Sequence, residues 1–127
     1  MRRDFIFAFV LTVGILLTTG CGTTSFKNAR DIAREKACAA NMRVIGCAIE
    51  LYNMDNKVFI TELKPEMIET NGSLLQQKCL RHPIRKPEHK CSYCSRGNLG
   101  DPKDEKAEIF CTFHGSVQEI DNKLRKK

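Results

Sequence analysis

One long, uninterrupted helical pattern constrains this chain most strongly. From Phe26 to Asp55 the sequence contains no proline and a single glycine, and apolar residues return at steps of three and four. That spacing places them on one wide stripe of an α-helix, which needs a partner to pack against. The charged beginning of the segment, residues 27–36, is expected to project from the domain. The later part is expected to pack on whatever the rest of the chain builds.

The remainder of the chain favours short elements. Pro65 is suited to the first turn of a helix, where its missing N–H costs nothing. Ser116 and Glu119 have the spacing of a capping box. The expected elements are a brief helix at 65–69, strands at 91–96 and 107–113, and a short terminal helix after Ser116. The predicted fold class is α+β, with the long N-terminal helix packed on a small antiparallel sheet or hairpin that cysteines staple.

The first 21 residues have the layout of an export signal. Arg2 and Arg3 are followed by the apolar run Phe5–Leu17, then by small residues and Cys21. A cysteine at the cut point resembles a bacterial lipoprotein signal, in which that thiol receives lipid. Residues 1–20 are therefore predicted to be a signal peptide, and Cys21 to be lipidated. The alternative is an uncleaved anchor over residues 5–26, because about 20 uncharged residues can span a bilayer.

The predicted signal determines the expected location of the protein and limits the partners that it can meet there. Residues 21–127 form one predicted domain, with a helical stem at 26–55 and a cysteine-rich part at 79–115. The predicted location is the cell envelope, membrane-anchored through Cys21 or residues 5–26, with the head outside the cytoplasm. The formal net charge is +6, but acidic residues interrupt the basic ones, and no nucleic-acid partner is expected.

Seven cysteines are many for a chain of 127 residues. Lipid on one leaves six, an even number that suits disulfide bonds in an oxidising compartment. Cys38 and Cys47 lie nine positions apart on one helix, so they face opposite sides and cannot bond to each other. Free or redox-active thiols are a further alternative. The disulfide candidates are Cys38, Cys47, Cys79, Cys91, Cys94 and Cys111.

A second interpretation of the late cysteines is a metal site. Cys91 and Cys94 are separated by two residues, as are Cys111 and His114, and sixteen residues lie between the two pairs. This is the spacing of a zinc ribbon, in which two knuckles present three thiolates and an imidazole. One structural zinc is therefore the alternative to the expectation of disulfides and no cofactor.

Two segments carry a family resemblance. The helix segment from Glu35 to Asp55 resembles the helix of bacterial type IV pilins and type II secretion pseudopilins. The segment Ile109–Gly115 is similar to the closing strand of some of those domains, in which a late cysteine is preceded by another across the hairpin. The resemblance implies a non-enzymatic structural or assembly role, with pilus or secretion-system subunits as partners. It also favours a bridge from Cys91 or Cys94 to Cys111.

The N-terminus departs from the prepilin pattern. Prepilins have a glycine before the cut and a glutamate five residues into the mature helix, whereas this chain has Arg3-Asp4-Phe5 and no glutamate before Glu35. The resemblance therefore implies a pilin-like head behind a lipoprotein-type anchor. Two alternatives remain: a filament subunit that retains residues 5–26 as a membrane helix, and a zinc-ribbon binding module on a lipoprotein stem. The sequence shows no catalytic constellation, and no enzymatic activity is expected.

Overall fold

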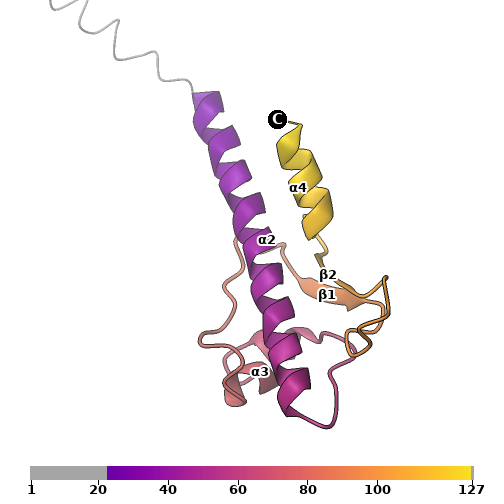
Figure 1. The fold of residues 1–127 in the computed structure, drawn as a ribbon. Helices are drawn as coiled ribbons and strands as arrows, with labels where there is room; N and C mark the ends of the chain where they lie inside the picture. The colour runs from indigo at the N-terminus through magenta and orange to yellow at the C-terminus, as the bar shows by residue number, and fades with distance from the viewer. Residues whose placement is uncertain (1–22, 127) are drawn as a thin grey trace, which may run out of the picture. The chain divides into compact units, whose positions relative to one another are not determined.

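The computed structural model describes residues 23–126 (Figure 1). The predicted signal peptide, residues 1–20, and the predicted lipidation site, Cys21, lie outside the described residues. The chain divides into two units between Arg30 and Asp31. The described part of the first unit is the beginning of a helix whose side chains are exposed from residue 25 to residue 30. The packing described below belongs to the second unit.

The long predicted helix is confirmed. Helix α2 runs over Thr23–Asp55 without interruption, and its C-terminus coincides with the predicted one. Asn53 fixes the reversal of the chain that follows, since its side-chain amide oxygen accepts a hydrogen bond from Ile60 N (2.7 Å) and its amide nitrogen donates to Ile60 O (3.3 Å). The chain thereby returns along the helix it has just left.

The core forms on one face of α2. Cys38, Met42, Ile45 and Ile49 follow one another at steps of four, three and four, and all are buried. This confirms that the later half of the helix packs on the rest of the domain, because helical positions at that spacing share one face. Ala39 and Ala48 of α2 are buried as well, and the remaining buried apolar residues come from later segments: Ile60, Leu63, Ile68, Leu74, Leu80, Cys91, Tyr93, Cys111 and Ile120.

Two short helical turns follow α2. The predicted brief helix is η1, Pro65–Ile68, and a further turn, α3, covers Ser73–Gln76. Gly72 separates them at a close approach, where an added Cβ would lie 2.2 Å from the carbonyl oxygen of Met67. Only glycine allows that contact, which brings Leu74 fully into the core.

The sheet is a small antiparallel meander. Strands β1 (Tyr93–Arg96), β2 (Glu108–Cys111) and β3 (Gly115–Ser116) lie in the order β1-β2-β3. The predicted hairpin is confirmed, although both strands are shorter than expected. The second strand ends at Cys111 because the chain turns back at once into β3, which was not predicted. Gly115 begins β3 with a φ of 88°, a left-handed conformation that favours glycine.

The chain ends in helix α4, Val117–Arg125. The predicted capping box is confirmed: Glu119 N donates to Ser116 Oγ, and Ser116 N donates to the Glu119 carboxylate. Helix α4 lies beside α2 (Figure 1), and the Arg43–Asp121 ion pair, at 2.8 Å, joins the two. The architecture is α+β as predicted: a long helix, a three-stranded antiparallel sheet and a short C-terminal helix.

Candidate metal centre

Four side chains that can bind a metal converge at one point of the core. Cys38 comes from α2, Cys91 from the segment before β1, Cys111 from the end of β2, and His114 from the turn between β2 and β3. Their ligand atoms all lie within 4.8 Å of one another. The three thiols are at most 1% exposed. The structure thus contains a buried Cys3His cluster that can hold a metal ion.

Local structure explains why these four residues meet. Cys38 belongs to the buried stripe of α2. In the sheet, Tyr93 pairs with Cys111, and Thr112 N donates to Ser92 O (2.9 Å), so the pairing continues beyond the end of β1. Cys91, two residues before Tyr93, shares the buried side of this segment, because side chains alternate along an extended chain. The turn after Cys111 then brings His114 against both cysteines.

The measured spacings suit a tetrahedral site. Cys91 Sγ lies 3.4 Å from His114 Nδ1, and Cys111 Sγ lies 3.9 Å from the same nitrogen. Zinc bound tetrahedrally by sulfur and nitrogen at its usual bond lengths holds its ligand atoms about 3.5–3.8 Å apart. The two distances from a cysteine sulfur to the histidine nitrogen are therefore close to those found between ligand atoms of a zinc site.

The three thiols differ in their electrostatic surroundings. Burial raises the pKa of Cys38 and that of Cys91 above the usual thiol value. Burial also raises the pKa of Cys111, but hydrogen bonds from the backbone N–H groups of His114 and Phe113 to its sulfur lower it. The net result is a pKa below the usual thiol value. The turn after β2 therefore stabilises one thiolate. Further thiolates in this buried space repel one another unless a cation compensates their charge.

Tyr93 and Asn41 brace the cluster from one side. The Asn41 amide nitrogen donates to the Tyr93 hydroxyl oxygen (2.8 Å) and to Arg85 O (2.8 Å), which ties α2 to β1 and to the loop over residues 81–90. Tyr93 is 1% exposed. Burial raises its pKa, and its hydroxyl interacts with the Cys38 thiol. This neutral phenol thus holds a position directly beside one of the four ligands.

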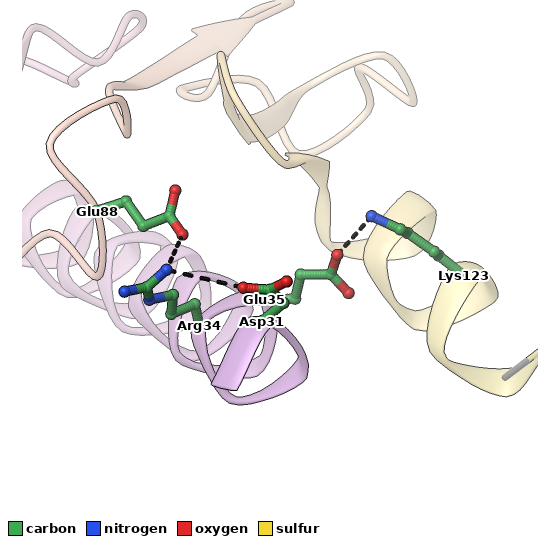
Figure 2. Close-up of polar contacts among 5 residues, drawn as sticks. All are labelled: Asp31, Arg34, Glu35, Glu88 and Lys123. Atoms are coloured by element: carbon green, nitrogen blue, oxygen red, sulfur yellow. Dashed lines mark hydrogen bonds and ion pairs between the residues drawn. The ribbon is translucent and has the colours of Figure 1, made fainter. Parts of the chain in front are cut away.

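Ion pairs hold the segments that carry the ligands (Figure 2). Arg34 on α2 contacts Glu88 at 3.0 Å and Asp31 at 3.7 Å, and the Glu35 carboxylate pairs with Lys123 of α4. The carbonyl oxygen of Glu88 in turn accepts a hydrogen bond from Cys91 N (3.1 Å). The Arg34–Glu88 pair therefore fixes the segment just before Cys91 against the helix that carries Cys38.

The predicted zinc ligands are corrected at one position. The structure brings Cys91, Cys111 and His114 together, but Cys94 does not join them, and Cys38 takes its place. Cys94 pairs with Phe110 in the register of β1 and β2 and is half-buried. Three positions separate it from Cys91, an odd number, so in an extended strand the two side chains face opposite sides. The predicted strand over 91–96 already contained that signal, and the buried stripe of α2 pointed to Cys38.

The remaining cysteines lie apart from this cluster. Cys47 is exposed, and with Cys38 fully buried, the prediction that the two face opposite sides of the helix is confirmed. Cys79 is half-buried, and its thiol donates to Gln77 O (3.7 Å). All six cysteines of the described chain are free thiols in this structure. The assignment of disulfides to Cys38, Cys47, Cys79, Cys91, Cys94 and Cys111 stays a prediction.

Comparison with protein families, curated proteins and solved structures gives no match for this chain. The resemblance to pilins and pseudopilins therefore stays a prediction that depends on the helix segment and the closing strand. Within residues 23–126, no helix has the length and apolar character required to cross a bilayer. The predicted membrane attachment falls mainly on residues 1–22, which the structure does not describe.

Proposed function

We propose that this protein is a non-enzymatic structural module of the cell envelope, and that one zinc ion bound by Cys38, Cys91, Cys111 and His114 holds its head together. The observation that carries the proposal is the convergence of three buried thiols and an imidazole within 4.8 Å of one another. These ligands come from α2, the segment before β1, the end of β2 and the turn after it, and they meet in the core.

The donor set suits zinc better than it suits disulfides. Thiolates with an imidazole are soft and borderline ligands that select zinc, and three cysteines with one histidine form a common structural set. A disulfide can join two of the three thiols, but the third thiol would then stay buried without a partner, and the half-buried histidine beside it would have no role. Zinc engages all four and compensates the charge of the thiolates.

A site of this kind stabilises and does not catalyse. Four protein ligands fill the tetrahedral positions and leave none open for water or substrate. The centre joins α2 to the hairpin, two parts of the chain that are far apart in sequence. A domain of about 100 residues buries limited apolar surface, so such a link contributes a large share of its net stability.

The envelope role depends on the sequence. The lipoprotein-like leader, with lipid at Cys21, anchors the head, and the pilin-like helix and hairpin support a role in display or assembly. Membrane lipid and pilus or type II secretion subunits are the corresponding partners. A filament subunit that retains residues 5–26 as a membrane helix remains the second candidate, favoured by the long continuous helix α2.

Metal content tests the zinc centre. We expect one zinc per chain in the full-length protein purified in detergent without added metal, measured by native mass spectrometry and elemental analysis. Cys38→Ser should lose the zinc, whereas the matched variant Cys94→Ser should keep it. Replacement of zinc by cobalt in the wild-type protein should give the sulfur-to-metal absorption of three thiolates. This test needs no variant. A metal-free protein with a bridge between any two of Cys38, Cys91 and Cys111 would contradict the centre.

Intact mass tests the anchor separately. The membrane-extracted protein should lack residues 1–20 and carry lipid mass at Cys21. A retained leader without lipid would instead support the filament subunit. Recovery of the full chain from the cytosol with its leader intact would contradict both envelope roles and would leave the zinc result standing.

A further inference from the structure

A groove of about 760 Å³ lies on the side of α2 that faces the loop over residues 97–107. Its apolar lining comes from α2, from Phe59 in the segment after α2, from this loop, from β2 and from the start of α4. Met42 and Ile49 line it from the core and are only 2% exposed, whereas the accessible apolar side chains along it are those of Met54, Phe59, Leu99, Ile109 and Val117. Phe59 is 52% exposed at this edge. The groove therefore offers apolar surface that the chain leaves open to solvent.

The charged residues along this groove all have the same sign. Glu50, Asp101, Asp104 and Glu108 line it, and none of its described lining residues is a lysine or an arginine. Backbone N–H groups of Asn98 and Lys106 donate to the Asp104 carboxylate, which lowers its pKa and keeps it ionised. Only Glu108 has a described ion-pair partner, Arg96 at 3.3 Å. The groove thus combines an apolar floor with an acidic rim.

A second surface of the domain has the opposite charge. The loop over residues 81–90 exposes four basic side chains, Arg81, Arg85, Lys86 and Lys90. Arg81 and Arg85 lie around a hollow of about 750 Å³ with Pro83, Ile84 and Val44 of α2. Val44 is 50% exposed. This basic face, residues 81–86 with Val44, matches the groove in its mixture of apolar and charged residues.

The two surfaces face different directions. Gly46 lines the groove and Val44 lines the basic face. Residues that are two positions apart in an α-helix are separated by about 200° around its axis, so Gly46 and Val44 lie on nearly opposite sides of α2. The basic face of one chain therefore does not reach the groove of the same chain, whereas the basic face of another chain can.

We propose that the acidic groove binds the basic face, residues 81–86, of a second copy of this chain. Arg81 and Arg85 then lie against the carboxylates of the rim, and Pro83 and Ile84 contact the apolar floor. Two different surfaces meet in this contact, so it is heterologous and leaves a free groove at one end and a free basic face at the other. The contact goes beyond the zinc centre and does not require it, because no groove residue is a ligand.

Self-association of the full-length protein in detergent tests this contact. Sedimentation velocity over a concentration series should show reversible association that weakens at least about tenfold when salt rises from about 50 to 500 mM, since charge pairs at the rim are screened. A wild-type protein that stays monomeric up to about 500 μM would overturn the proposal without any variant.

Charge reversal identifies the surfaces. Glu50→Lys with Asp101→Lys reverses the groove, and Arg81→Glu with Arg85→Glu reverses the basic face. Each variant alone should associate at least about tenfold more weakly than wild type, and an equimolar mixture of the two should associate as wild type does. The matched control, Glu62→Lys with Glu105→Lys, reverses exposed charges outside the groove and should change association by less than about twofold.

Two results would contradict the assigned surfaces: wild-type association in either reversed variant, or no association in the mixture. Zinc content is measured in the same samples, so loss of the metal centre is distinguished from loss of the contact. If a reversed variant loses its zinc, the neutral pairs Glu50→Gln with Asp101→Asn and Arg81→Gln with Arg85→Gln take its place. Each neutral pair should then weaken association in the same direction.

Discussion

The six described cysteines form two groups of three with opposite properties. Cys38, Cys91 and Cys111 are fully buried and lie together, whereas Cys47, Cys79 and Cys94 are exposed or half-buried and lie outside that cluster. Sequence spacing does not separate the two groups, since Cys91 and Cys94 look like one knuckle. The side of the helix or strand on which each cysteine lies does separate them.

Burial is the physical cause of this division. The inner three cysteines share the core with residues such as Met42, Tyr93 and Ile120, so their thiols meet because their elements pack. The outer three have no such common surface. We therefore expect the inner group to respond to metal as one unit, and each outer cysteine to respond to its own surroundings.

Removal of the metal should have the largest effect. A structural zinc site in a small peptide binds with an apparent free energy of about 10–16 kcal/mol, as much as the whole stability of a typical domain. A strong chelator should therefore abolish the near-ultraviolet circular dichroism of the domain and its cooperative melting, and added zinc should restore both. An unchanged melting curve after complete removal of zinc would show that the inner group does not stabilise the domain through a metal.

Single substitutions should divide the groups in the same way. Cys111→Ser should lower the free energy of unfolding by more than about 3 kcal/mol, because it removes a ligand at the centre of the core. Cys94→Ser makes the same chemical change on the neighbouring strand and should cost less than about 1 kcal/mol. Chemical denaturation in saturating zinc measures both values. Equal losses in the two variants would show that Cys94 belongs to the inner group.

Local signals predicted most of the fold. The helical periodicity gave α2 with its correct end, Pro65 marked η1, and the Ser116–Glu119 spacing marked the cap of α4. Each of these signals involves residues within one turn or a few turns of each other. Strand β3 and helix α3 escaped prediction because they are two and four residues long and depend on the packing around Gly115 and Gly72.

The site was predicted in part. Cys91, Cys111 and His114 were recognised because they lie on one hairpin, where spacing along the chain reflects spacing in the fold. Cys38 belongs to another element, and only the packing of α2 against the hairpin brings it to the site. The knuckle spacing predicts Cys94 as a ligand, but the alternation of side chains along the strand places it on the side opposite to Cys91. The leader and the envelope role stay predictions.

The brace beside the cluster should show a moderate effect. Tyr93→Phe removes the hydroxyl that accepts from the Asn41 side chain and leaves the half-buried Asn41 amide with Arg85 O as its acceptor. The expected loss is about 1–2 kcal/mol of unfolding free energy with zinc bound. Tyr52→Phe, the same change at the other tyrosine of the chain, should cost less than about 0.5 kcal/mol. A Tyr93→Phe variant as stable as wild type would show that Tyr93 contributes only its ring.

The outer cysteines should differ modestly from one another in their rates of alkylation, because each thiol has its own surroundings. Burial raises the pKa of Cys79, and the negative charge of Asp55 raises it further. Below that pKa, only a minor fraction of Cys79 is the reactive thiolate, so its alkylation rate should keep rising with pH after an ordinary thiol has levelled off. Asp55→Asn removes the charge, lowers the pKa and should speed alkylation of Cys79 about twofold near pH 8.

Peptide-level mass spectrometry follows each cysteine of the zinc-loaded protein in one sample. Cys38 and Cys111 should stay unmodified throughout, whereas Cys79 reacts at its own rate. Glu62→Gln removes a different exposed carboxylate and serves as the matched control that should leave the Cys79 rate unchanged. A slower rate in Asp55→Asn would contradict the sign of the effect. A rate change shared by Cys79 and Cys38 would instead mean that the outer cysteine is coupled to the inner group, because only a common opening of the core would expose both.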